Sequence, residues 1–193
     1  MSSRADVVAA AQEMHRLGLV VGTAGNVSAR EGDVVHITPA GLAYLDMTER
    51  DLVTLAPDGE VVEGERAPSS EWRVHVAVYA ARPEVGAIVH THSVQATAWS
   101  CLDEPLDTAI KEFRQAAGGE VWTAEDAPAG TDQIARYAVE ALEGRNAALL
   151  YRHGVLGLGE SPARALVMCQ VIERHAEIAW LLRQGAAGPG RPE

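Results

Sequence analysis

Apolar positions recur with a helical period in several segments of the chain. In residues 5–17 they return every three or four residues, on one stripe of a helix that Gly18 would end. In residues 161–185 the apolar pattern is long and follows Ser161-Pro162, a capping residue and a first-turn proline typical of a helix start. The pattern predicts helices over residues 5–17, 69–81, 131–143 and 161–185.

Short apolar runs between turn residues predict strands. They follow the small-residue loop at 22–30, continue through 33–41, and recur near 52–55 and 60–62, at 86–93 and over 147–159. Strands and helices alternate without a regular βαβ period, and neither GxGxxG nor GxxxxGK[ST] is present. This order favours a three-layer α/β arrangement with a mixed sheet over a dinucleotide-binding fold. One domain over residues 1–184 and a flexible Gly/Pro tail over 185–193 are expected.

The bulk composition excludes some classes of partner. The 193 residues carry a formal net charge of −11, so the surface offers no basic field for nucleic acid or an anionic membrane. A small phosphorylated substrate in a local pocket remains compatible with that charge. No apolar run reaches the length of a membrane span, the N-terminus lacks the apolar core of a signal peptide, and only two cysteines are present. A cytoplasmic protein is predicted.

Two histidines stand one residue apart in the apolar run AIVHTHSV, residues 87–94. In a strand, His90 and His92 would point to the same face, about 6–7 Å apart, and could reach one metal ion. A catalytic zinc site takes three protein ligands and keeps one position open. His153 is the best third candidate, because Gly154 after it allows close approach of the backbone. A hydrogen-bonded structural pair remains the alternative on these residues alone.

A second candidate site lies at the start of the helix predicted over 69–81. Ser69 or Ser70 would cap that helix, and two hydroxyls beside free backbone N–H groups suit a phosphate. Glu71 follows in the first turn. It is either an acid that stabilises the helix dipole or a general base beside the metal.

The motifs together are similar to those of the class II aldolase/adducin family. They occur in family order over most of the chain: GTAGNVS (22–28), ITPAG (37–41), SSEWRVHVAVYAARP (69–83), AIVHTHS (87–93), AAGGE (116–120) and RHGVLGLGE (152–160). The resemblance implies a single three-layer α/β/α domain with a central mixed, largely antiparallel sheet. It also implies a homotetramer with active sites at subunit interfaces.

The resemblance assigns a role to each candidate residue. It implies one Zn²⁺ per subunit on His90, His92 and His153, with Glu71 as acid/base and as a further metal ligand when substrate is absent. The implied activity is a carbon–carbon lyase that cleaves a ketose 1-phosphate of the L-fuculose 1-phosphate type, through a metal-stabilised enediolate, to dihydroxyacetone phosphate and a small aldehyde. The implied phosphate site consists of Gly25, Asn26, Ala40, Gly41, Ser69 and Ser70.

In the part of the site that would hold the aldehyde, the chain differs from family members that act on fuculose phosphate. The stretch before AAGG holds Glu112 and Phe113 and no tyrosine, and Ala129 replaces an aromatic residue. Three alternatives therefore remain. One is a methylthioribulose-1-phosphate dehydratase with Glu112 as an acid, another is a pentulose-phosphate 4-epimerase, and the third is a non-catalytic adducin-like binding module.

Overall fold

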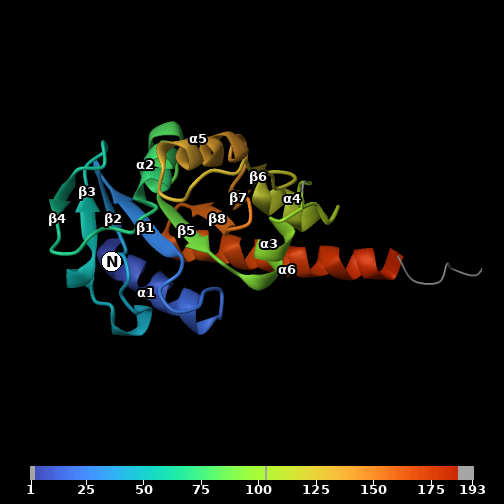
Figure 1. Cartoon of the computed structure of the whole chain (residues 1–193), viewed down its shortest axis with the longest axis horizontal. Coiled ribbons are helices and arrows are strands. Elements are labelled where there is room, and N and C mark those ends of the chain that lie inside the picture. The colour runs from blue at the N-terminus through green and yellow to red at the C-terminus, as the bar shows by residue number, and fades with distance from the viewer. Residues whose placement is uncertain (1–2, 103, 187–193) are drawn as a thin grey trace, which may run out of the picture.

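A mixed sheet forms the centre of the molecule (Figure 1). The computed structural model describes residues 3–102 and 104–186, and within them eight strands lie in the order β4-β3-β2-β1-β5-β8-β7-β6. All neighbouring strands are antiparallel except β6 and β7. The predicted mixed, largely antiparallel sheet is confirmed. The strands are β1 Asn26–Glu31, β2 Val34–Ile37, β3 Val53–Leu55, β4 Val61–Glu63, β5 Ala87–Thr91, β6 Thr123–Ala124, β7 Ala147–Leu150 and β8 Gly154–Gly159.

Helices cover both faces of the sheet and give the predicted three layers. Helices α1 (Ser3–Arg16) and α6 (Pro162–Ala186) lie on one face, and α2 (Trp72–Ala81) and α5 (Asp132–Ala141) lie on the other (Figure 1). The shorter helices are α3 (Val94–Trp99), α4 (Lys111–Ala117) and the 3-10 turns Tyr44–Asp46 and Glu49–Asp51. Of the helices in the described ranges, none has the length and apolar character required to cross a bilayer.

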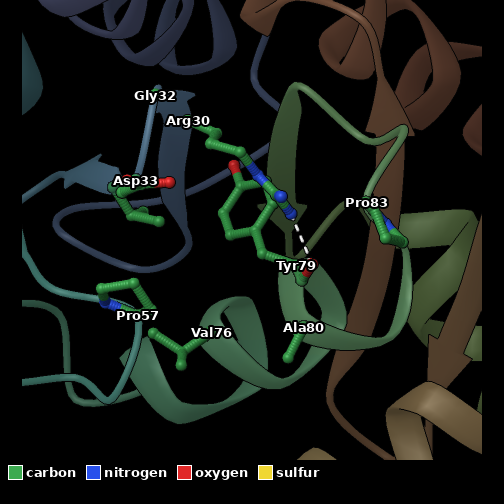
Figure 2. A pocket seen from close by; sticks show the side chains of 9 residues that line it. Arg30, Gly32, Asp33, Pro57, Val76, Tyr79, Ala80 and Pro83 are labelled. Atoms are coloured by element: carbon green, nitrogen blue, oxygen red, sulfur yellow. Dashed lines mark hydrogen bonds between the residues drawn. The ribbon is translucent and has the colours of Figure 1, made fainter.

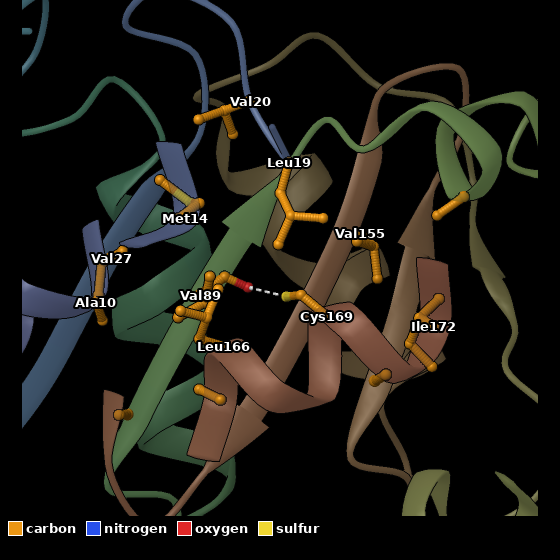
Figure 3. Packing of buried hydrophobic residues seen from close by; sticks show 14 of the residues in the cluster. Ala10, Met14, Leu19, Val20, Val27, Val89, Val155, Leu166, Cys169 and Ile172 are labelled. Carbon is orange, nitrogen blue, oxygen red and sulfur yellow. Dashed lines mark hydrogen bonds between the residues drawn. The ribbon is translucent and has the colours of Figure 1, made fainter. Parts of the chain in front are cut away.

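Each face of the sheet has its own apolar core. Alternate strand residues face opposite layers, so Val89 packs toward α1 and α6 while Ile88 packs toward α2 and α5. On the first face, the Cys169 thiol of α6 donates to the carbonyl oxygen of Val89 at 3.4 Å (Figure 3). This packing holds β5, the central strand that carries His90, rigidly between the two layers.

The structure corrects three local predictions. Helix α2 begins at Trp72, three residues later than predicted, with Glu71 at its N-cap position in place of Ser69 or Ser70. Residues 147–159 form a hairpin of β7 and β8, so His153 lies in the turn between them and not in a strand. Helix α6 continues through Gly185 and Ala186, and the rest of the predicted tail, 187–193, lies outside the described residues.

Candidate metal centre

Four side chains converge at the end of β5. The ligand atoms of Glu71, His90, His92 and His153 all lie within 4.8 Å of one another. The three imidazole rings are mutually edge-on, with centroids 4.8 Å apart in each pair. Three imidazoles and one carboxylate within such a volume form a donor set that suits a divalent metal ion.

Strand pairing brings these ligands together from distant parts of the sequence. His90 lies in β5 opposite Leu156 of β8, and the β7–β8 turn that precedes β8 carries His153. His92 follows the last residue of β5, and its backbone N–H donates to the carbonyl oxygen of Leu19 at 3.1 Å. The expectation that His90 and His92 share a face is confirmed by their Nε2 atoms, which are 2.9 Å apart.

Hydrogen bonding and burial prepare these histidines for metal binding. The Nδ1–H of His90 donates to the carbonyl oxygen of Val155 at 3.0 Å, so the lone pair of Nε2 faces the cluster. Burial lowers the pKa of His92 to about 4 and holds the pKa of His153 below its usual value, with the neighbouring His90 acting in the same direction. At neutral pH His92 and His153 are therefore uncharged, as metal coordination requires.

Glu71 supplies the carboxylate of the cluster from the N-terminal end of α2. Its Oε2 accepts a hydrogen bond from Nδ2 of Asn26 at 2.9 Å and lies 3.2 Å from Nε2 of His90. Its Oε1 is buried and 3.4 Å from Nε2 of His153, and it has no hydrogen-bond partner among the described residues. Burial opposes ionisation, but the surrounding imidazoles and Asn26 outweigh it and hold the pKa of Glu71 below its usual value. A charged carboxylate with one unpartnered buried oxygen fits a cation beside it.

The β7–β8 turn leaves no room for a side chain next to His153. A Cβ at Gly154 would lie 2.2 Å from the carbonyl oxygen of Thr91 and 3.2 Å from ring carbons of both His90 and His92. The interpretation that Gly154 permits close approach of the backbone is thus confirmed.

If the cluster holds a divalent metal ion, substituting Gly154→Ala is expected to weaken its binding, measured with zinc, at least tenfold, because the new methyl group displaces two of the imidazoles. The forced shift should also lower the free energy of unfolding by about 1–3 kcal/mol. A competition titration with a chromophoric chelator and urea unfolding would measure both effects. Gly185→Ala is the matched control, since its Cβ meets nothing within 4 Å in α6. Wild-type zinc affinity in Gly154→Ala would show that the close packing does not position the ligands.

The zinc-free protein should lose stability as the pH falls from about 6.5 to 4. Burial lowers the pKa of His75 to about 3 and that of His92 to about 4, so over this interval the unfolded chain binds more protons than the folded one. The free energy of unfolding should fall by up to about 1.4 kcal/mol per pH unit for the fully buried His75, and by less for the half-buried His92, whose charge solvent screens. Urea unfolding of EDTA-treated protein at several pH values measures the slope. His75→Gln should reduce that slope, and an unchanged slope would contradict the assignment.

Four of the six residues predicted to bind phosphate, Gly25, Asn26, Ser69 and Ser70, lie next to Glu71 or His90. Gly25 has a φ of 78° and passes so close to β5 that a Cβ would lie 2.5 Å from the carbonyl oxygen of His90. Asn26 is 1% exposed, and its amide N–H donates a hydrogen bond to Glu71. Ser69 is buried and accepts a hydrogen bond from the backbone N–H of Glu71 at 3.3 Å, while Ser70 is exposed.

The other two predicted phosphate residues follow β2. The backbone N–H of Ala40 donates to the carbonyl oxygen of Ala67 at 3.0 Å, next to a bridge between Pro39 and Pro68. Gly41 has a φ of 70° and open space where a side chain would be. The pairing brings the 39–41 turn alongside the segment that leads to Ser69. Phosphate binding by the six residues stays a prediction.

The segment that departs from the family pattern forms α4. Phe113 is fully buried and stacks on His175, with ring centroids 4.4 Å apart. Glu112 is exposed in the first turn of α4. Phe113 is therefore a core residue, and the role considered for Glu112 stays untested.

Two residues near the site were not predicted from the sequence. Tyr44 is buried, and its hydroxyl donates to the carbonyl oxygen of Gly25 at 2.6 Å, which fixes the loop before β1. His75 is fully buried on α2 and hydrogen-bonded to Asn26. The spacing of His75, four residues after Glu71, was the available signal, because such residues share a helix face.

Comparisons with known proteins agree with this geometry. The family model "Class II Aldolase and Adducin N-terminal domain" matches residues 5–180. The chain is 40% identical to the 5-methylthioribulose-1-phosphate/5-deoxyribulose-1-phosphate aldolase of Rhodospirillum rubrum over 177 residues, 92% of this chain and 80% of the relative. It is 39% identical to the L-fuculose phosphate aldolase of Escherichia coli (strain K12) over 166 residues, 86% of this chain and 77% of the relative. A solved structure of L-fuculose 1-phosphate aldolase superposes with a TM-score of 0.91 at 34% identity, covering 98% of this chain and 90% of that one.

Proposed function

Because this chain belongs to the class II aldolase and adducin family, we propose that it is a zinc-dependent aldolase that cleaves a ketose 1-phosphate to dihydroxyacetone phosphate and a small aldehyde. The observation that carries the proposal is the convergence of three imidazoles and one carboxylate, whose ligand atoms all lie within 4.8 Å of one another. A binding module would have no need for four buried or half-buried ionisable groups at one point, since each costs desolvation energy.

His90, His92 and His153 would hold the metal ion, with Glu71 as the fourth ligand until substrate arrives. A bound divalent ion supplies Lewis acidity, which polarises the substrate carbonyl and stabilises the negative charge of the transition state. Three imidazole ligands favour zinc, and a transition metal such as Co²⁺ or Mn²⁺ would compete for the same donors.

Glu71 is the group that moves protons in the proposed reaction. Cleavage of a ketose 1-phosphate breaks the C3–C4 bond: the C4 hydroxyl gives up its proton as C4 becomes the aldehyde carbon, and C3 of the departing dihydroxyacetone phosphate gains one. Glu71, which is ionised before the reaction, would take up the first proton and return it to C3. The unpartnered Oε1 of Glu71 is the oxygen available for this transfer, because Oε2 is occupied by Asn26. Glu71 is only 7% exposed, which limits the contact of its carboxylate with bulk water.

The phosphate end of the substrate would bind beside Glu71. We assign it to Gly25, Asn26, Ala40, Gly41, Ser69 and Ser70, which lie at the start of β1, in the 39–41 turn and just before α2. The exposed hydroxyl of Ser70 and the open left-handed turn at Gly41 support this assignment. Binding a remote phosphate orients the reacting carbons toward the metal centre. The homotetramer implied by the family remains part of the proposal.

The aldehyde half of the substrate is the least constrained part of the proposal. The relatives named above act on ketose 1-phosphates that differ in this half: a fuculose phosphate, and the 5-methylthio- and 5-deoxyribulose phosphates. The absence of a tyrosine around Phe113, together with the burial of that ring, favours neither substrate by itself.

A substrate panel tests the proposal. EDTA-treated and zinc-restored protein would be assayed with L-fuculose 1-phosphate, 5-deoxyribulose 1-phosphate and 5-methylthioribulose 1-phosphate, with dihydroxyacetone phosphate detected by a coupled reductase. We expect zinc-dependent release of dihydroxyacetone phosphate from at least one of them. Consumption of 5-methylthioribulose 1-phosphate without dihydroxyacetone phosphate would identify a dehydratase. No turnover of any member by zinc-loaded protein would overturn the proposal for these substrates.

A further inference from the structure

A continuous series of buried hydrogen bonds leads from Glu71 into the contact between α2 and β1. Glu71, His75 and Tyr79 are spaced four residues apart, so they lie on one stripe along α2. Asn26 and Ser28 are two residues apart, so they lie on one face of β1. The five residues are 7%, 0%, 5%, 1% and 0% exposed, respectively.

The side chains of the two elements alternate along this series. Asn26 Nδ2 lies 2.9 Å from Glu71 Oε2, and Asn26 Oδ1 lies 2.5 Å from His75 Nε2. His75 Nδ1 lies 2.6 Å from Ser28 Oγ, which lies 2.8 Å from the hydroxyl of Tyr79. Both nitrogens of the His75 ring and both ends of the Asn26 amide are therefore engaged.

The Glu71 carboxylate, at the end of the series, determines which atom donates and which accepts in every hydrogen bond of the series. The Glu71 carboxylate only accepts, so the Asn26 amide must turn its NH₂ toward it and its oxygen toward His75. His75 then carries its proton on Nε2, and Nδ1 accepts from Ser28. The Ser28 oxygen in turn accepts from Tyr79. All donors point toward Glu71, an arrangement in which successive hydrogen bonds strengthen one another.

We propose that His75 is a positioning residue of the metal centre, which acts through Asn26 to hold Oε2 of Glu71 and leave Oε1 as the oxygen that faces the reaction. Without the Nε2–H of His75, Asn26 Oδ1 would lose its buried hydrogen-bond donor, and only the Glu71 carboxylate would orient the amide. The amide, and Oε2 of Glu71 with it, would then be held less firmly. The link to catalysis rests on the proposed role of Glu71, whereas the orientation of Asn26 does not.

The surroundings argue against a purely structural role for the series. Beside this series, the buried side chains that pack between α2 and the sheet are apolar and include Val74, Val78 and Ile88. Apolar side chains at the Ser28 and His75 positions would extend this core without the desolvation cost of burying polar groups. The polar series instead follows the one path that ends at Glu71.

The outer end of the series lies at a surface cavity. The Tyr79 ring lines that cavity beneath the guanidinium of Arg30, whose carbon lies 4.7 Å from the ring centroid (Figure 2). The same guanidinium donates to the Tyr79 carbonyl oxygen at 2.5 Å. These contacts fix the tyrosine, and through it the direction in which Ser28 donates.

Kinetics of zinc-loaded variants test the proposal. His75→Phe should lower kcat about 10–100-fold and change KM and zinc affinity less than threefold. The effect should fall on kcat because His75 acts through Asn26, which holds the Glu71 carboxylate. His75→Gln retains a donor in place of Nε2 and should recover kcat to within about threefold of wild type. His36→Phe is the matched control, because it removes another buried histidine, bonded to Thr54 and Glu31, outside the series. Wild-type kcat in His75→Phe, or an equal loss in His36→Phe, would overturn the proposal.

A spectroscopic measurement tests the orientation without turnover. Long-range ¹H–¹⁵N correlation of the zinc-loaded protein distinguishes the two neutral forms of histidine. We expect a single Nε2–H form for His75, and loss of this preference in Asn26→Leu. A wild-type Nδ1–H form would reverse the donor order and overturn the proposal. If no substrate is turned over, only the role of Glu71 fails, and this measurement still decides the orientation.

Discussion

Glu71→Gln is expected to lower kcat by about 10²–10⁴-fold while the protein still binds one zinc ion per chain. The loss is the usual cost of removing a general acid/base from a reaction that needs proton transfer at carbon. Glutamine has nearly the same shape as glutamate, so the packing at the N-terminus of α2 should survive.

The neighbours of Glu71 determine how the new amide will sit. Asn26 donates to Oε2 of Glu71, so the glutamine oxygen should turn toward Asn26 and its NH₂ toward the imidazoles. A group that only donates at this position can neither take up nor return a proton. Zinc content by atomic absorption and steady-state kinetics would be measured together.

The control for this substitution is Glu84→Gln. Glu84 is an exposed carboxylate just after α2 that pairs only with Arg82 among the described side chains. Its substitution should leave zinc content and kcat within experimental error. Wild-type cleavage rates in Glu71→Gln would remove Glu71 from the acid/base role and leave it as a metal ligand only.

His92→Ala is expected to abolish zinc binding at micromolar concentrations and to lower activity more than 10³-fold. The substitution removes one of three imidazoles whose ring centroids are 4.8 Å apart, and the space it leaves opens toward solvent. The variant keeps two imidazoles and Glu71, so the ion loses one of its four donors, and Glu71 would have to remain on the metal instead of serving the substrate.

Thermal unfolding with and without zinc provides a second readout of His92→Ala. A ligand that binds only the folded protein stabilises it by about 2.7 kcal/mol at a concentration 100 times its Kd. Wild-type protein should therefore melt at a higher temperature with zinc than with EDTA, and His92→Ala should show no difference. His175→Ala, a histidine of α6 outside the cluster, should keep the zinc-dependent increase. Retention of that increase in His92→Ala would exclude His92 as a ligand.

The metal centre was predictable because short-range rules determine much of it. Alternation along a strand was enough to place His90 and His92 on one face, and a glycine after His153 indicated close backbone approach. The convergence of His153 with the pair depends on β5 lying beside β8, which no local pattern specifies. Similarity to a family of known fold supplied that part of the prediction.

The parts that sequence reasoning missed are short or depend on tertiary contacts. Helices α3 and α4 have six and seven residues, and β6 has two, too few for a periodic pattern. Helix α2 begins three residues later than predicted because Glu71 is its N-cap residue, outside the helix, where the carboxylate faces the imidazoles. His75 was overlooked because its partners come from β1, on another element of the fold.

The adjacency of β5 and β8 has a consequence for the order of folding. An unfolded chain offers a metal ion the local pair His90 and His92, while His153 arrives only when two strands more than fifty residues apart have paired. Such non-local pairing forms late, because its loop-closure entropy must be overcome first. Zinc should therefore bind tightly only after the centre of the sheet has closed. During refolding with a zinc indicator, the rate at which free zinc is taken up would therefore report the rate at which β5 and β8 pair.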